Sequence, residues 1–213
     1  LAGTRVIPLV IKKDKMEQAK KVAGQEPLLR VAAFKKKRAG VVTTGSEVYH
    51  GRIADTFTPV IAEKLAEYGC TIEKHVVLSD DAAQITAAIK GMLDDGLDIV
   101  ICTGGMSVDP DDRTPLAIRN SGARIVSYGA PVLPGAMFLL AYTDDMRPVM
   151  GLPGCVMYSR RTIFDLVLPS IMADVPVTAE RLARYGEGGL CLSCGECRFP
   201  HCEFGRASCR ERV

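Results

Sequence analysis

The stretch Asp98-Ile-Val-Ile-Cys-Thr-Gly-Gly-Met-Ser-Val-Asp-Pro-Asp-Asp-Arg-Thr-Pro115 decides the fold. It opens with an apolar run at residues 99–102, which predicts a short strand buried on both faces, as in a parallel sheet. The run breaks at Thr103-Gly104-Gly105, where two glycines can adopt positive φ and place no Cβ between the backbone and a ligand. Thr114-Pro115 then predicts the start of a helix.

The residues around this glycine turn indicate a site for a phosphorylated ligand. A glycine turn between a parallel strand and a helix presents free N–H groups to an anion. Asp109, Asp111 and Asp112 follow the turn within four residues, and a helix cap would need only one of them. Carboxylates beside such a turn can hold Mg²⁺ through one or two oxygens. For the glycine pair alone, a tight turn without a ligand is the alternative.

Predicted strands and helices alternate along the rest of the chain. Strands are predicted at 39–44, 71–78 and 123–128, helices at 56–68, 79–96, 113–121 and 156–168, and a β-hairpin at 137–142 and 148–152. This alternation implies βαβ units, so we predict a three-layer α/β/α fold with a mostly parallel sheet. Ligands of such folds bind beyond the carboxyl ends of the strands, where the polar loops 44–46, 79–81, 104–112 and 151–155 are expected.

Composition and length limit the class of protein. The chain has 213 residues, of which 47% are hydrophobic, enough to bury one full α/β core. Its net charge of +2 argues against a dedicated nucleic-acid binder. No apolar run approaches the roughly 20 residues of a membrane span. Cys70, Cys102 and Cys155 are scattered singly, which favours a reducing compartment and hence the cytoplasm.

We expect three parts along the chain. Residues 1–38 read as the remnant of an upstream domain or a linker, with a strand at 3–11 and a short charged helix at 14–21. Because the chain begins at Leu1 rather than Met, we expect it to derive from a longer protein. Residues 39–175 form the α/β domain, and residues 186–213 form a Cys-rich C-terminal tail.

Two separate motifs carry a resemblance to a known family. Thr103-Gly104-Gly105-Met106-Ser107, followed by Asp112-Arg113-Thr114-Pro115, resembles the signature of the molybdopterin-binding domain. This domain is shared by molybdopterin adenylyltransferase, molybdopterin molybdenumtransferase and CinA-like nucleotide hydrolases. The resemblance implies a homo-oligomeric transferase of molybdenum cofactor biosynthesis. Its ligands would be molybdopterin, as the free or adenylylated pterin phosphate, Mg²⁺ and ATP.

The resemblance also implies roles for particular residues. Asp80, after the second predicted strand, and Asp112, which closes the Gly-Gly loop, would be catalytic. The expected ligand-binding residues are Thr44, Gly45, Ser46, Asp55, Thr103, Gly104, Gly105, Ser107, Pro134, Gly135, Pro153 and Gly154. For Asp55 and for Asp80, helix capping is an equal alternative.

The chain departs from the family pattern in its positive charges. The molybdenumtransferase flanks its Pro-Gly turn with lysines, whereas here Leu133 and Ala136 flank Pro134-Gly135. Arg124, Arg147 or Arg160 could replace them only if the fold brings one in. Two alternatives therefore stay open. One is a CinA-like nucleotide hydrolase. The other is a non-catalytic module that binds the cofactor and docks onto a molybdoenzyme or another cofactor-assembly protein.

The tail predicts a metal site of its own. Cys191, Cys194, Cys197 and Cys202 follow the flexible joint at 186–189 with spacings close to those of ferredoxin clusters. Four thiolates would equally suit tetrahedral Zn²⁺. We therefore predict zinc or an iron–sulfur cluster in the tail, with a disordered or disulfide-linked tail as the alternative.

Overall fold

The computed structural model of the chain describes residues 10–24, 30–107, 109 and 111–187. It divides the chain into two compact units, Leu1–Ala33 and Phe34–Val213. The described part of the first unit contains helix α1 (Lys13–Ala23), which confirms the charged helix predicted at 14–21. The strand predicted at 3–11 lies, up to residue 9, outside the described residues, and so do the four tail cysteines.

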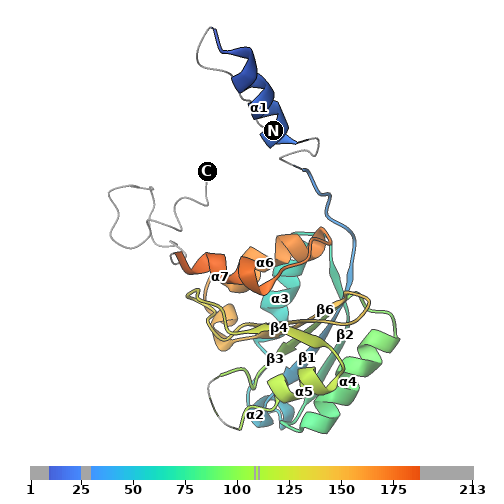
Figure 1. The fold of residues 1–213 in the computed structure, drawn as a ribbon. Coiled ribbons are helices and arrows are strands. Elements are labelled where there is room, and N and C mark those ends of the chain that lie inside the picture. The colour runs from blue at the N-terminus through green and yellow to red at the C-terminus, as the bar shows by residue number, and fades with distance from the viewer. Residues whose placement is uncertain (1–9, 25–29, 108, 110, 188–213) are drawn as a thin grey trace. The chain divides into compact units, whose positions relative to one another are not determined.

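The second unit is built on a mostly parallel sheet, as predicted (Figure 1). Its strands within the described residues are β1 (Arg38–Thr44), β2 (Thr71–Leu78), β3 (Ile99–Thr103), β4 (Arg124–Tyr128), β5 (Leu139–Tyr142) and β6 (Pro148–Leu152). Their order is β2-β1-β3-β6-β5-β4. The pairs β1–β2, β1–β3 and β3–β6 are parallel, whereas β5 is antiparallel to both β4 and β6. The hairpin predicted at 137–142 and 148–152 is thereby confirmed.

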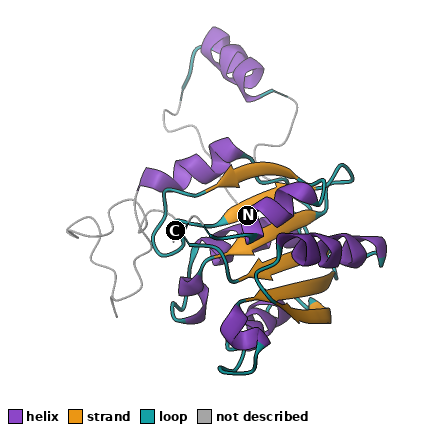
Figure 2. Ribbon diagram, turned by 90° about the horizontal axis from the view of Figure 1, so that it is seen from below, coloured by secondary structure: helices purple, strands orange, loops and turns teal. Residues whose placement is uncertain are grey.

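Helices cover both faces of the sheet, so the three-layer α/β/α fold is confirmed (Figures 1 and 2). One face carries α3 (Phe57–Ala66), α6 (Ile163–Met172) and α7 (Ala179–Arg184), whose apolar side chains form one core cluster with the sheet. The other carries α4 (Ala82–Asp94) and α5 (Thr114–Asn120), which form a second cluster. Every residue of the central strand β3 is buried, because helices pack on both of its faces.

The segment after β6 differs from the single helix predicted at 156–168. The chain forms a short 3₁₀ helix, η1 (Gly154–Met157), and α6 begins only at Ile163. Thr162 and Asp165 build a capping box there, which is a start signal inside the stretch predicted as continuous helix. The prediction was wrong because the apolar residues on either side of the polar stretch 159–162 were joined into one helix.

Three further elements were not predicted. The polar loop after β1 contains a short helix, α2 (Ser46–Tyr49). Beyond residue 175 the chain continues through α7 and a last 3₁₀ turn, η2 (Tyr185–Glu187). Val177 and Leu182 from this stretch belong to the core beneath α6, so the packed structure extends past residue 175.

The topology brings the polar loops to one edge of the sheet. Strands β1, β2, β3 and β6 run in the same direction, so the loops after them meet at their carboxyl ends. Thr103 of β3 lies between Thr43 of β1 and Leu152 of β6 in the strand register. Strand β4 also runs this way, because β5 is antiparallel to both β4 and β6. We call this side of the sheet the carboxyl edge.

Candidate functional site

The Gly104–Gly105 turn lies at the centre of the carboxyl edge. Its two residues have φ values of 81° and 54°, which glycine adopts without strain. A Cβ on Gly104 would collide with the backbone carbonyl of Thr44, and a Cβ on Gly105 would lie 2.9 Å from Oγ1 of Thr114. Among the described residues, the backbone N–H groups of Gly105 and Met106 have no hydrogen-bond partner. The turn is therefore open to an anion.

Asp112 ties the loop after this turn together. Its Oδ2 accepts the backbone N–H of Ser107 at 2.6 Å. The N-cap position of α5 belongs to Arg113, so Asp112 is not the helix cap that three closely spaced aspartates could have supplied. No hydrogen bond occupies its Oδ1 within the described part of the chain. One oxygen of Asp112 thus holds the loop, and the other is available to a cation.

Tyr128 supports the same loop from β4. Its hydroxyl donates to the backbone carbonyl of Ser107 at 3.1 Å. Burial, together with the negative charge of Asp112, raises the pKa of Tyr128, so its hydroxyl keeps the proton that it donates. The sequence pattern predicted only that Tyr128 lies in a strand. The one sequence signal for its contact with this loop was its position as the last residue of a strand that ends at this edge.

Asp80 performs a similar task for the loop after β1. Its Oδ2 accepts the backbone N–H of Ser46 at 3.1 Å and the hydroxyl of Ser46 at 3.2 Å. The capping alternative does not apply to Asp80, because Asp81 caps α4 by accepting the N–H groups of Ala83 and Gln84. These backbone hydrogen bonds lower the pKa of Asp81. Asp80 stays exposed, with its Oδ1 unused by any described residue.

Asp55, by contrast, does cap a helix. Oδ1 of Asp55 accepts the N–H groups of Phe57 at 2.8 Å and Thr58 at 3.1 Å, at the start of α3. Its Oδ2 accepts the Thr58 hydroxyl and lies 3.2 Å from Nε2 of His75. Burial raises the pKa of Asp55, but hydrogen bonds from Thr58 and Phe57 and the charge of His75 together hold it below its usual value. Asp55 therefore positions α3, and both of its oxygens are engaged.

Buried threonines connect the loops below the turn. The hydroxyl of Thr114 donates to the carbonyl of Gly104 at 2.9 Å and lies 3.4 Å from the hydroxyl of Thr44. Oγ1 of Thr103 is buried without a partner, the only such side-chain atom among the described residues. A buried unpaired hydroxyl costs free energy, so an oxygen of a ligand or of water is the expected partner of Thr103.

The remaining expected site residues also lie at the carboxyl edge. Gly45 has a φ of 137° and precedes α2, and Pro153 is buried directly before Gly154 opens η1. The Pro134–Gly135 turn packs against the start of α6, where the N–H of Ile163 donates to the Pro134 carbonyl at 3.2 Å. The edge therefore holds all the turns that the sequence analysis singled out.

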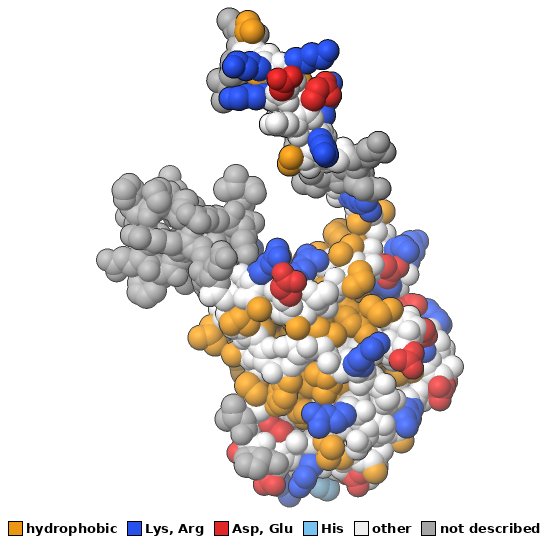
Figure 3. Space-filling view, in the orientation of Figure 1, with side chains coloured by type: hydrophobic (Ala, Val, Ile, Leu, Met, Phe, Trp, Pro, Cys, Tyr) orange, Lys and Arg blue, Asp and Glu red, His pale blue; other side chains and the backbone are white. Residues whose placement is uncertain are grey.

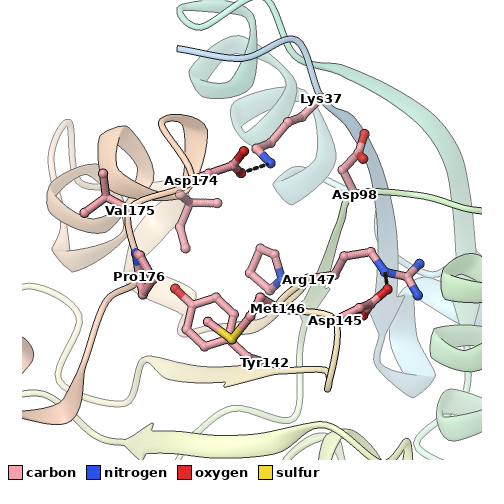
Figure 4. A pocket seen from close by; sticks show the side chains of 11 residues that line it. Lys37, Asp98, Tyr142, Asp145, Met146, Arg147, Asp174, Val175 and Pro176 are labelled. Carbon is pink, nitrogen blue, oxygen red and sulfur yellow. Dashed lines mark hydrogen bonds and ion pairs between the residues drawn. The ribbon is translucent and has the colours of Figure 1, made fainter. Parts of the chain in front are cut away.

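The opposite, amino edge holds a separate pocket of about 360 Å³, shown in Figure 4. Lys37, just before β1, and Asp98, just before β3, line it. Lys37 forms an ion pair of 2.5 Å with Asp174, and Arg147 one of 2.8 Å with Asp145 (Figure 4). The guanidinium of Arg147 also donates to the Leu93 carbonyl at 2.6 Å, near the end of α4.

This arrangement decides which arginine can serve the carboxyl edge. Arg147 is held at the amino edge by the contacts just described. Arg124 opens β4 beside Tyr142, which lines the same amino-edge pocket. Arg160 alone of the three follows the carboxyl end of a strand, β6. No described residue pairs with its guanidinium.

No group of three or more His, Cys, Asp or Glu side chains among the described residues is arranged to hold a metal ion, and the tail cysteines lie outside that range. None of the described helices has the length and apolarity needed to span a membrane.

Comparison with known proteins gives a family and a fold. Residues 40–173 match the family described as "Probable molybdopterin binding domain". A CinA-like protein of Mycobacterium marinum is 40% identical over 77 residues, 36% of this chain and 18% of that protein. One of Mycobacterium tuberculosis is 38% identical over 90 residues, 42% of this chain and 21% of that protein. The chain thus spans about a fifth of the length of these curated relatives.

Solved structures agree with this assignment. The molybdopterin biosynthesis enzyme MoaB from Thermus thermophilus superposes with a TM-score of 0.55 at 25% identity, over 63% of this chain and 91% of that one. CinA from Thermoplasma acidophilum superposes with a TM-score of 0.53 at 20% identity, over 64% of this chain and 98% of that one, and shows the fold alone.

Proposed function

This chain belongs to the molybdopterin-binding domain family, and from that membership we propose that it binds molybdopterin in molybdenum cofactor biosynthesis. The bound form would be the pterin phosphate or its adenylylated derivative. The observation that carries the proposal is the Gly104–Gly105 turn, whose neighbouring N–H groups at Gly105 and Met106 are open to a phosphate. The unpaired hydroxyl of Thr103 lies at the foot of the same turn.

The residues present fit Mg²⁺ as a companion of that phosphate. Asp80 and Asp112 follow β2 and β3, which flank β1, so their loops are roughly 10 Å apart across the edge. Each carboxylate keeps one oxygen free of the described residues. Mg²⁺ commonly binds through one or two carboxylates together with ligand phosphates, so a cage of three protein ligands is not required. Bound there, Mg²⁺ would neutralise charge on the phosphate during transfer.

Calorimetry with molybdopterin, ATP and ADP-ribose in parallel, each with and without Mg²⁺, tests the proposal. We expect molybdopterin to bind, and we expect Mg²⁺ to tighten its binding. Turnover of molybdopterin with ATP would identify an adenylyltransferase, and binding without turnover would identify a cofactor-binding module. Failure of molybdopterin to bind under every condition would contradict the proposal.

A CinA-like nucleotide hydrolase is the second candidate. It is favoured by the CinA-like proteins of Mycobacterium, which are 38–40% identical over the segments matched. Binding and hydrolysis of ADP-ribose, with no affinity for molybdopterin, would select this candidate over the first.

We further propose that the chain forms homo-oligomers. Strand β4 ends the sheet and pairs only with β5 among the described strands. Exposed hydrophobic residues on and near it include Tyr128 and Leu133. Hydrophobic side chains gather across the middle of the face in Figure 3. Light scattering after size exclusion measures the mass, and a monomer at micromolar concentration would contradict this part of the proposal.

A further inference from the structure

The side chain of Met106, directly after the Gly104–Gly105 turn, is buried in the core. It is 4% exposed and belongs to the cluster that the sheet forms with α4 and α5. Val149 of β6 lies in the same cluster, whereas Met150 belongs to the cluster on the opposite face. Since the side chains of a strand alternate between its faces, position 151 faces the same side as Val149. Met106 therefore anchors the end of the turn on the sheet itself.

Gly151 of β6 makes room for this anchor. A Cβ at position 151 would lie 2.6 Å from both Sδ and Cε of Met106, and 3.3 Å from the Cβ of Leu139 on β5. A glycine in the interior of a strand weakens the strand and often marks the close approach of another group. Here the approaching group is the thioether of Met106. We call Gly151 and the side chain of Met106 the methionine socket.

Hydrogen bonds hold the turn on either side of its two open N–H groups. Before them, the carbonyl of Gly104 accepts the hydroxyl of Thr114 at 2.9 Å. After them, the N–H of Ser107 donates to the carboxylate of Asp112 at 2.6 Å. Between these contacts, neither open N–H group has a hydrogen-bond partner among the described residues. The buried side chain of Met106 lies in this interval and fixes the backbone there.

We infer that the methionine socket directs the open N–H groups of Gly105 and Met106 toward an anion, which makes Met106 a positioning residue of the candidate site. The inference rests on the proposed function and deepens it, because it names what sets the geometry of the phosphate-binding turn. A turn binds an anion through N–H groups that converge on it. Without the socket, the turn would have this geometry only part of the time, and the apparent affinity would fall by that fraction.

Met106→Ala empties the socket, and Met92→Ala is its matched control. Met92 is fully buried in the same core cluster and lies against another strand glycine, Gly40 of β1, so both variants remove the same atoms from one core. In the ligand-free chain, the NMR order parameter of the Gly105 amide should fall from about 0.85 to below about 0.6 in Met106→Ala only. Inorganic phosphate should bind about tenfold more weakly to Met106→Ala and as before to Met92→Ala. An equal response of both variants, or of neither, would overturn the inference.

Gly151→Ala tests the socket without a change in the turn itself. The added methyl group should displace the Met106 side chain and weaken phosphate binding about tenfold. In the Met106→Ala background the same change should have no further effect, because the colliding side chain is absent. Gly40→Ala is the control, since its Cβ would lie 2.5 Å from Sδ of Met92, in the amino half of β1. Phosphate binding to Gly40→Ala should stay within about twofold of the wild type, and the same result for Gly151→Ala would contradict the inference.

These outcomes separate the inference from the proposed function. If phosphate and molybdopterin bind the wild type, Met106→Ala and Gly151→Ala equally well, the inference is wrong and the proposed function stands. If molybdopterin does not bind the wild type, the proposed function fails. The order parameter of Gly105 in the ligand-free variants then decides by itself whether Met106 positions the turn.

Discussion

At the scale of single residues, the candidate site depends on carboxylates that hold backbone groups. Asp80 and Asp112 each accept the N–H of a serine, Ser46 and Ser107, with one oxygen. The loops are thus fixed before any ligand arrives, so less entropy is lost on binding. Gly104 adds a steric condition. A side chain there would disturb the loop of Thr44 as well as the anion site, so its replacement cannot separate binding from stability.

Asp112→Asn separates the two roles of this carboxylate, which holds the loop with one oxygen and leaves the other available to a cation. The amide oxygen of asparagine can still accept the N–H of Ser107, so the loop should stay closed. The lost negative charge should abolish Mg²⁺-dependent turnover and leave metal-free molybdopterin binding within about twofold. Asp81→Asn is the control, because asparagine caps helices as well as aspartate does. Unchanged turnover in Asp112→Asn, measured at saturating Mg²⁺, would remove the metal role of Asp112.

At the scale of elements, a buried ion pair joins two of the helices that cover one face of the sheet. Lys64 of α3 and Asp165 of α6 are 2.6 Å apart, and their side chains are 8% and 7% exposed. Asp165 also accepts the backbone N–H of Thr162 and completes the capping box of α6. The same carboxylate therefore fixes both the start of α6 and its contact with α3.

Lys64→Met should therefore lower the free energy of unfolding by roughly 3 kcal/mol, because it leaves Asp165 buried without its closest cation. Lys74→Met is the matched control. Its ion pair with Asp95 has the same length of 2.6 Å, but the side chains are 44% and 56% exposed. That change should cost less than about 1 kcal/mol. Urea unfolding measures both, and equal losses would show that burial of the pair contributes nothing.

At the scale of the whole molecule, the packed part of the chain extends from Phe34 to at least α7. The unit Leu1–Ala33 contributes no buried residue from its described helix. Val177 and Leu182, in contrast, are 2% and 1% exposed and belong to the main core.

Two truncations test these limits. Removal of residues 1–33 should leave the melting temperature within about 2 °C of that of the full chain. Ending the chain at residue 175 should destabilise it by roughly 3–5 kcal/mol, since burial of each large apolar side chain contributes about 1.5–3 kcal/mol. Calorimetric melting measures both truncations. Unchanged stability of the chain that ends at residue 175 would place the end of the domain before α7.

We also propose that the Cys-rich tail binds zinc or an iron–sulfur cluster. Four thiolates close in sequence would repel one another without a metal, and metal binding would order a segment too short for its own core. Cys191→Ser should lose the metal without changing the melting of the α/β unit. Elemental analysis of protein purified without oxygen is the measurement. Less than about a tenth of an equivalent of both zinc and iron would contradict the metal site.

The sequence alone determined the strands of the sheet, the Gly-Gly turn and the family, because these depend on local patterns. The strand predicted at 71–78 matches β2 residue for residue, since period and composition act over neighbouring residues. Only the tertiary structure decided which aspartate caps a helix and which holds a loop. It also decided that Arg124 and Arg147 lie at the amino edge, away from these loops. These choices rest on contacts such as Asp80 with Ser46, 34 residues apart, that no local pattern encodes. Their cause is the direction of parallel strands, which gathers distant loops at one edge and leaves Arg124 and Arg147 at the other.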